Sequence, residues 1–125
     1  MGKCVFCEDF ITNKKNIFEN ELALAYFDVF PVNKGHVLII TKRHVETFFD
    51  TTKEEQDAMF ELARKIKIYL DEEYKPDGYN IGFNCGVVAG QSVMHVHMHI
   101  IPRYKGDIEN PRGGIRAVIP AKKDY

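Results

Sequence analysis

The segment His95-Val96-His97-Met98-His99-Ile100-Ile101 limits the fold of this chain more than any other feature. Histidine alternates with apolar residues throughout it. Because successive side chains of a strand point to opposite faces, a strand here places three imidazoles on one face and Val96, Met98 and Ile100 on the other. The apolar face can pack into a core. A buried structural role accounts for one histidine, but three in strict alternation favour a functional site.

Two chemical interpretations of this segment are open. Three neighbouring imidazoles can hold a catalytic zinc with one open position, or one imidazole can be a nucleophile while the others bind anionic oxygens. The preceding residues Gly90-Gln91-Ser92 favour the second interpretation. An amide and a hydroxyl are suitable donors for phosphate oxygens, whereas a zinc triad does not need them.

The remaining pattern predicts a mixed domain with an antiparallel sheet and one main helix across a face, the α+β class. The helix is expected to begin after Thr52, because Thr52 and Glu55 have the spacing of a capping box. In chain order we expect strands at 22–27 and 36–41, joined by a turn at 28–35, then a helix at 53–74, a strand at 79–84, a loop at 85–92, and a strand from about 93 to 101 that ends at Pro102.

Length and charge narrow the class further. The 125 residues fit one domain spanning 1–125, with a tail from about residue 108 that carries no motif we can interpret. A net charge of −1 argues against nucleic acid as a partner. No apolar run approaches the roughly 20 residues that span a bilayer, and the first nine residues lack the apolar core of a signal peptide, so we expect a cytoplasmic protein without membrane contact.

The chain contains three cysteines, of which Cys4 and Cys7 form a C-x-x-C pair. An odd number of cysteines in an intracellular chain favours a metal site or free thiols over a disulfide framework. A metal site built on the pair needs two further ligands. Cys85 stays unassigned.

The stretch from Gly90 to Ile101 resembles the signature of the histidine triad (HIT) family, in which G-Q-S/T-V precedes H-φ-H-φ-H-φ-φ. Upstream, Phe27-Asp28, Pro31 and residues 35–40 resemble the family's ribose-binding acidic residue and its G-H-φ-φ-φ strand. The resemblance implies a HIT-like fold, an antiparallel sheet of about five strands with one main helix. It also implies a homodimer formed through the helix and a sheet edge.

In that family the central histidine attacks the α-phosphorus of a nucleotide and carries a nucleotidyl phosphoramidate that water hydrolyses. The matching residue here is His97. A neutral imidazole is a competent nucleophile near pH 7, provided that its other nitrogen is held by a hydrogen bond. The resemblance assigns phosphate contacts to His99, Gln91 and Ser92, and nucleotide contacts to Asp28, His36 and Asn84. Phe27 is an aromatic residue that could face the base.

Asp28 has two interpretations of equal weight. Its carboxylate can accept hydrogen bonds from both ribose hydroxyls, as the resemblance implies, or it can be a turn residue. The implied ligand is a purine nucleotide, as a dinucleoside polyphosphate or a nucleoside phosphoramidate.

Some HIT proteins combine an N-terminal C-x-x-C with a histidine after the second strand and with the first histidine of the triad. This resemblance implies a structural zinc held by Cys4, Cys7, His44 and His95, which would remove His95 from acid–base chemistry. Other branches of the family lack this zinc.

Residues 99–107 are more similar to the dinucleoside-polyphosphate hydrolase branch. Arg103, Lys105 and Arg112 could contact distal phosphates or could be solvated surface charges. The alternatives to a nucleotidyl hydrolase or transferase are a nucleotide-binding regulatory module with little turnover and a zinc-dependent hydrolase that uses the triad as metal ligands.

Overall fold

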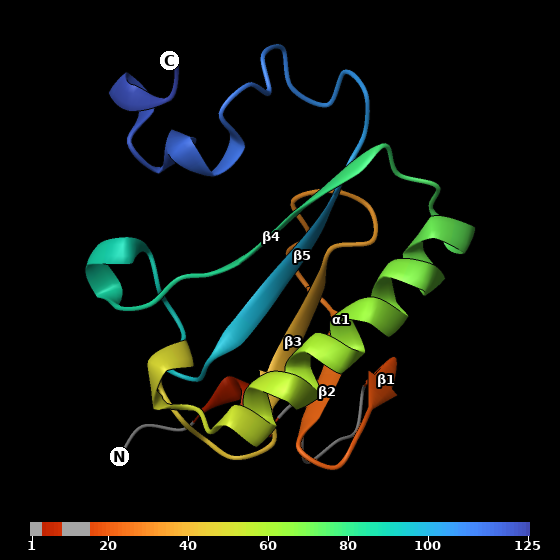
Figure 1. Cartoon of the computed structure of the whole chain (residues 1–125), viewed down its shortest axis with the longest axis vertical. Coiled ribbons are helices and arrows are strands. Elements are labelled where there is room, and N and C mark those ends of the chain that lie inside the picture. Colours follow the sequence, from red (N-terminus) through yellow and green to blue (C-terminus); the bar gives the residue numbers. More distant parts are fainter. Residues whose placement is uncertain (1–3, 9–15) are drawn as a thin grey trace.

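The computed structural model describes residues 4–8 and 16–125. Part of the N-terminal stretch on which the expected localisation rests lies outside them. Figure 1 shows one antiparallel sheet, with strand order β1-β2-β3-β5-β4, and one long helix packed across it, which confirms the expected α+β class. The elements are β1 (Phe18–Glu19), β2 (Ala23–Phe27), β3 (Val37–Thr41), α1 (Lys53–Glu73), β4 (Gly78–Phe83) and β5 (His97–Arg103), with short 3-10 helices η2 (Phe48–Asp50), η3 (Val87–Ala89), η4 (Gly114–Val118) and η5 (Pro120–Lys122).

The helix α1 begins and ends close to the predicted positions. Thr52 is its N-cap, and the reciprocal hydrogen bonds with Glu55 form the expected capping box. It ends at Glu73 because Lys75 takes a left-handed backbone, with φ of 50°, and Pro76 follows. No helix in the described part of the chain is long and apolar enough to span a membrane. The face that packs on the sheet is formed by Met59, Leu62, Ile66 and Leu70, at helical spacing.

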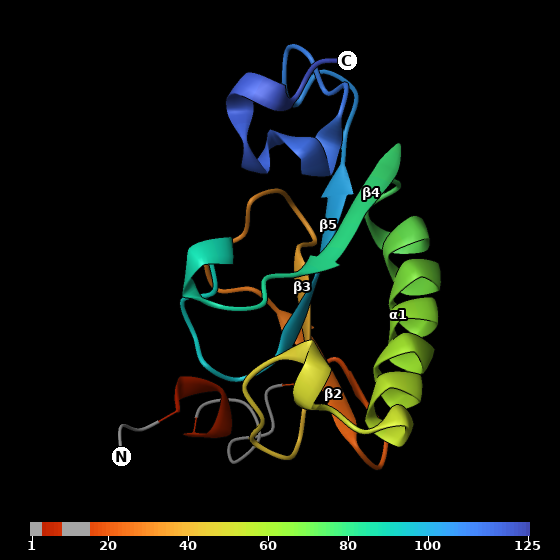
Figure 2. The ribbon, with the colours of Figure 1, turned by 60° about the vertical axis from the view of Figure 1, so that its left-hand side comes forward.

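The sheet is covered by apolar side chains on both faces. On one face Val37, Met98 and Ile100 join the helix residues in the main core. The opposite face carries a smaller apolar cluster of Phe6, Leu24, Tyr26, Leu38 and Ile40. In the register of β3 and β5, Leu38 lies opposite His99 and Ile40 opposite His97, so these two imidazoles share the face of the smaller cluster. Figure 2 shows α1 on one side of the sheet and the N-terminal residues on the other.

Strand β5 differs from the prediction at both ends. It begins at His97, because residues 93–95 form a bend instead of continuing the ladder, so His95 precedes the strand. It also runs through Pro102, which pairs with Tyr79. Pairing with β3 ends at Ile100, and the Pro102 carbonyl accepts a hydrogen bond from the Asn33 side chain on that side. A proline nitrogen facing this vacant edge interrupts no ladder hydrogen bond.

Strand β1 is an element that the sequence pattern did not predict. Its two residues, Phe18 and Glu19, pair with Ala25 and Leu24 of β2. A pair of residues is too short to show a periodicity of two, so only the resemblance implied a fifth strand.

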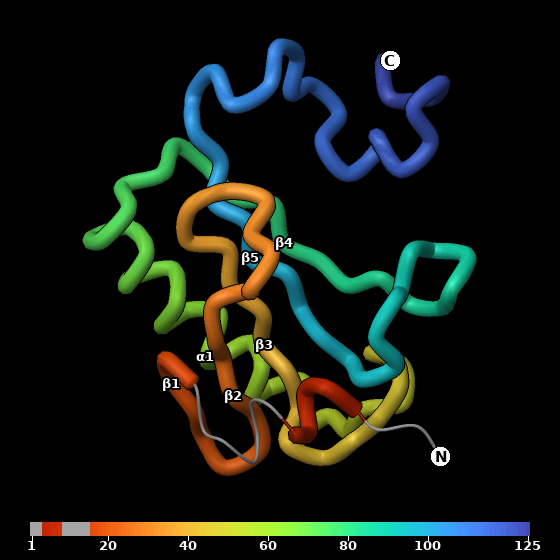
Figure 3. Tube along the Cα trace, turned by 180° about the vertical axis from the view of Figure 1, so that it is seen from behind, coloured from red at the N-terminus to blue at the C-terminus, as the bar shows by residue number. Residues whose placement is uncertain are grey.

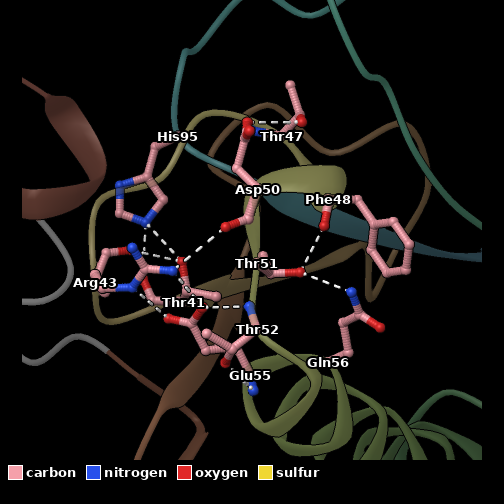
Figure 4. A network of polar contacts seen from close by, with 10 residues as sticks. All are labelled: Thr41, Arg43, Thr47, Phe48, Asp50, Thr51, Thr52, Glu55, Gln56 and His95. Atoms are coloured by element: carbon pink, nitrogen blue, oxygen red, sulfur yellow. Dashed lines mark hydrogen bonds and ion pairs between the residues drawn. The ribbon is translucent and has the colours of Figure 1, made fainter.

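A polar network joins the start of α1 to the histidine segment (Figure 4). The buried carboxylate of Glu55 accepts two hydrogen bonds from Arg43, at 2.7 and 3.0 Å, and one from the backbone of Thr52. The Arg43 guanidinium lowers the pKa of this carboxyl. The Arg43 carbonyl accepts from the Thr41 hydroxyl, and the Thr41 carbonyl accepts from His95 Nε2 at 2.7 Å.

This network predicts that removing the Glu55 carboxylate lowers the free energy of unfolding more than removing the Asp57 carboxylate, which is also on α1. Glu55→Ala removes the capping-box acceptor and the partner of Arg43, so we expect unfolding in urea to show a loss of about 2 kcal/mol. Asp57→Ala removes only an exposed ion pair with Lys53 and serves as the matched control, with a much smaller change. Equal losses in the two variants would contradict this account of the helix start.

Candidate functional site

Four predicted metal ligands from distant parts of the chain lie together. One potential ligand atom from each of Cys4, Cys7, His44 and His95 lies within 4.8 Å of the others. His95 Nδ1 lies 3.4 Å from the sulfur of Cys4 and 3.5 Å from that of Cys7, while His44 Nδ1 lies 3.6 Å from Cys7 Sγ. Two thiols and two imidazoles are the donor set of a closed tetrahedral zinc site.

The protonation pattern of the cluster also fits a metal. His95 Nε2 carries its proton, because it donates to the Thr41 carbonyl, and Nδ1 therefore presents a lone pair to the cysteines. Burial lowers the pKa of His95 to about 4, so the ring is neutral. Burial and the neighbouring Cys4 raise the pKa of Cys7 to about 11 in the protein alone, and a bound cation would offset this by binding the thiolate.

A backbone hydrogen bond fixes the tautomer of His97. Its Nδ1 lies 2.9 Å from the carbonyl oxygen of His95, which can only accept, so Nδ1 carries the proton. The lone pair is therefore on Nε2. The edge of Phe6 packs against the His97 ring, with centroids 5.1 Å apart, and only 7% of His97 is exposed. The hydrogen bond at Nδ1 and the packing against Phe6 thus fix the orientation of the His97 imidazole.

A second chain of hydrogen bonds fixes the opposite tautomer in His99. The backbone N–H of Val32 donates to His36 Nδ1 at 3.0 Å, so a neutral His36 carries its proton on Nε2. That nitrogen lies 3.0 Å from His99 Nδ1, which accepts, and leaves the His99 proton on Nε2. Burial lowers the pKa of His99 to about 4, and also lowers that of His36, against the opposing charge of Asp28.

The three triad histidines do not converge on one metal position. His95 belongs to the cysteine cluster, and His99 belongs to a separate group with Asp28 and His36. A metal in that second group would have to replace the hydrogen bond between His36 and His99. The geometry therefore argues against a catalytic zinc held by the triad, and leaves one nitrogen lone pair, on His97 Nε2, next to one N–H donor, on His99 Nε2.

A cavity of about 300 Å³ opens beside His99. It is lined by His36 and Asn84, the predicted nucleotide contacts, and by His99, the predicted phosphate contact. His97 neighbours it, with its ring centroid 5.1 Å from that of His99. The other lining residues come from the 28–35 loop, from β4 and β5, and from the C-terminal segment: Val32, Asn80, Ile81, Gly82, Phe83, Ile101, Ile115 and Val118.

Gln91 and Ser92 occupy different environments. Gln91 is buried, and its amide accepts from the Gly86 N–H and donates to the carbonyls of Glu46 and Val93. These three bonds hold the loop before β5, whereas a phosphate contact would have to break one of them. Ser92 is exposed in the same loop, where its hydroxyl can reach solvent or a ligand.

Phe27 does not lie where the sequence analysis placed it. Alternation along β2 puts it on the same face as Ala25, and it packs against Tyr69 and Tyr74 near the end of α1. This is the face opposite the histidines, so the expected contact with the base is corrected. Asp28 has the turn contact of one interpretation, since Oδ1 accepts from the Phe30 N–H, while Oδ2 lies 3.5 Å from His36 Nε2 and the ribose contact stays a prediction.

The basic residues after the triad are engaged elsewhere in the molecule. Arg103 bonds to Asp107 and to the Asn80 side chain, and Arg112 lies over the Tyr125 ring. Lys105 lines a different, solvent-open cavity with Tyr74 and Tyr104. Phe6, Thr41, Ile115 and Val118 are site neighbours that no motif indicated, because their roles depend on tertiary packing alone.

Comparison with known proteins agrees with this arrangement. The model of the HIT domain family matches residues 11–106. A bis(5'-adenosyl)-triphosphatase of Dictyostelium discoideum is 41% identical over 80% of this chain and 67% of its own. Protein hit of Bacillus subtilis is 42% identical over 83% of this chain and 74% of its own. A zinc-bound histidine triad family protein from Mycobacterium smegmatis superimposes with a TM-score of 0.76 and 35% identity, over 84% of this chain and 78% of that one.

This chain therefore belongs to the HIT domain family. The match covers the sheet, the helix and every histidine discussed above, but it stops before the C-terminal segment from residue 108.

The low pKa of His99 predicts a pH dependence of stability. Between pH 6.5 and about 4 the unfolded state binds a proton at this residue that the folded state does not, so stability falls as pH is lowered through that window. We expect wild type to lose up to about 1 kcal/mol more than His99→Gln between pH 7 and pH 5.5, since solvent at the cavity screens part of the effect. Urea unfolding at both pH values measures this. The cluster of Cys4, Cys7, His44 and His95 is common to both proteins and cancels, so parallel losses would contradict a neutral, buried His99.

Proposed function

We propose that the protein is a nucleotidyl hydrolase or transferase that breaks a bond at the α-phosphorus of a nucleotide, with His97 as the nucleophile. One observation carries the proposal. The His97 Nδ1–H is held by the His95 carbonyl, so that Nε2 carries the lone pair, in a ring whose centroid lies 5.1 Å from that of the His99 ring.

The first step is displacement at phosphorus. His97 Nε2 donates its electron pair to the α-phosphorus, a P–N bond forms, and the P–O or P–N bond to the leaving group breaks and releases its electron pair to that group. A polyphosphate leaves as a stable anion and needs no proton, whereas the amine of a phosphoramidate leaves only after its nitrogen has taken a proton from solvent. The positive charge that develops on the imidazole is stabilised at Nδ1 by the bond to the His95 carbonyl.

The second step reverses the first with water as the nucleophile. Water attacks the phosphorus, the P–N bond to His97 breaks, and the imidazole recovers its lone pair as the water proton passes to solvent. The product is a nucleoside monophosphate, and an acceptor other than water would give transfer. During both steps the His99 Nε2–H can donate to a phosphate oxygen without changing its own protonation state.

The remaining contacts support a nucleotide rather than another phosphate ester. Asn84 lines the cavity, and we propose that it and Ser92 contact the phosphates, while Gln91 shapes the loop that presents them. The half-buried Asp28 carboxylate lies next to His36, where it can accept from ribose hydroxyls. The similarity to the Dictyostelium triphosphatase favours a dinucleoside polyphosphate as the substrate.

We also propose that Cys4, Cys7, His44 and His95 hold a structural zinc. Bound there, zinc would supply a cross-link between the N-terminal residues and the segment entering β5. Two observations support this: the donor set, and the Thr41 carbonyl that orients His95. The zinc-bound mycobacterial relative agrees with it.

A homodimer is a further part of the proposal. β4 is an edge strand of the sheet, and Ile81 on it is half exposed. Phe60 and Ile68 expose apolar area on α1. A helix and a sheet edge with exposed apolar residues are suited to a symmetric contact.

Replacing the nucleophile tests the mechanism. We expect His97→Ala to lower kcat for hydrolysis of a diadenosine polyphosphate by about a thousandfold or more, with the dissociation constant of adenosine monophosphate little changed, because the variant loses the covalent route but few ground-state contacts. Steady-state kinetics measures kcat, and titration calorimetry measures the dissociation constant. A variant that binds the monophosphate poorly but turns over at the wild-type kcat would rule out His97 as the nucleophile.

The metal proposal predicts about one zinc per chain in purified protein, detected by elemental analysis. Cys7→Ser should lose most of the metal and lower the thermal midpoint, because the ligand set is broken. Cys85→Ser is the matched control, since Cys85 lies outside the cluster, and it should keep the metal. Equal zinc content in the two variants would contradict the assignment.

A further inference from the structure

The cavity beside His99 is lined by two chemically different groups of residues. The polar group includes His36, His99 and Asn84, next to the proposed reaction centre. The apolar group includes Val32, whose N–H bonds to His36, and Ile115 and Val118 of the C-terminal segment. A cavity lined by apolar side chains and a few polar groups is the usual composition of a site that binds one small molecule in a fixed orientation.

The C-terminal segment, residues 108–125, forms one wall of the cavity and is held together by hydrogen bonds within itself. Arg116 donates to the carbonyls of Lys122 and Lys123, and the Lys123 ammonium donates to the Asn110 carbonyl. Gly113 closes this turn: its φ is 92°, and a β-carbon there would lie 2.6 Å from the Lys123 oxygen. These bonds fix the shape of the segment before any ligand binds.

Two guanidinium groups pack over the ring of Tyr125 next to this turn. The guanidinium of Arg112 lies 5.0 Å from the Tyr125 ring centroid, and that of Arg116 lies 4.7 Å from it. Residues 108–125 contain four basic and two acidic side chains, so the segment carries a net positive charge close to the cavity, although none of its basic residues lines it. A positive wall attracts a polyphosphate.

The same side of the molecule exposes apolar side chains. Figure 3 shows the 28–35 loop, η3 and the C-terminal segment on the face away from α1. Val32 is 67% exposed, Ile115 63% and Val118 73%, although all three line the cavity. A planar base inserted between them would remove this apolar area from water, which is favourable.

We propose that this cavity is the subsite for the leaving half of the substrate and that it takes a second nucleoside. The inference rests on the function proposed above. Asp28, the proposed ribose contact of the retained nucleotide, does not line the cavity, whereas His99 and Asn84, at the phosphates, do. A chain of phosphates that starts beside His97 therefore passes His99 and ends with its nucleoside against Ile115 and Val118.

The subsite gives the C-terminal segment a role in specificity. A dinucleoside polyphosphate would contact His99 and Asn84 as well as Ile115 and Val118, whereas a nucleoside phosphoramidate with a small amine would leave Ile115 and Val118 without a contact. The binding energy of the second nucleoside acts only on substrates that carry one. Ile115 and Val118 should consequently distinguish these two substrate classes.

The test compares two substrates in three proteins. Wild type, the double variant Ile115→Ala/Val118→Ala, and the control Ile119→Ala are assayed with diadenosine triphosphate and with adenosine phosphoramidate. Ile119 belongs to the same segment and is similarly exposed, but it does not line the cavity. We expect the double variant to lose about tenfold in kcat/KM for diadenosine triphosphate and less than about twofold for the phosphoramidate. The control should match wild type with both.

Each other outcome overturns a defined part of the account. Equal losses for the two substrates would mean that the cavity holds the retained nucleotide. No loss with either substrate would remove the C-terminal segment from substrate binding. Wild type that cleaves the phosphoramidate but not diadenosine triphosphate would refute the second-nucleoside subsite while leaving the nucleotidyl chemistry intact, and wild type that cleaves neither would refute the proposed function itself. An unchanged thermal midpoint excludes unfolding of the double variant.

Discussion

The hydrogen bond from His97 Nδ1 to the carbonyl oxygen of His95 is the contact on which the proposed chemistry depends. It joins two residues that are only two positions apart, and it decides which nitrogen of His97 holds a lone pair. The same carbonyl belongs to a residue whose own ring faces Cys4 and Cys7. The backbone at His95 thus links the cysteine cluster to the imidazole proposed to attack. A well-ordered cysteine cluster therefore favours a well-ordered His97 ring, and the reverse.

The sheet makes this linkage rigid. β5 lies between β3 and β4, so its backbone is paired on both sides up to Ile100. Its apolar residues are held in the core under α1, and the histidine face is backed by the cluster around Phe6 and Tyr26. Side chains packed from two faces have few alternative rotamers, which suits a site whose geometry must be set before the substrate arrives.

Much of this arrangement could be predicted from the sequence, because it follows from periodicity. The period of two placed His97 and His99 on one face, and the Thr52–Glu55 spacing located the start of α1. Details that depend on tertiary contacts could not be predicted. The amide of Gln91 is used by backbone groups 2 to 45 residues away, and Pro102 is tolerated in β5 only because β3 has already ended beside it. Nothing in residues 108–125 indicated that Ile115 and Val118 border the cavity.

The tautomers of the histidines test the central claim most directly. Nitrogen-15 NMR of the imidazole rings at pH 8, above the ordinary range of imidazole pKa values, distinguishes a protonated from an unprotonated ring nitrogen. The account predicts that His97 carries its proton on Nδ1 and that His99 carries its proton on Nε2, so that neighbouring rings have opposite tautomers. A His97 ring protonated on Nε2 would have its lone pair on Nδ1, directed at the His95 carbonyl oxygen, and would contradict the division of roles described above.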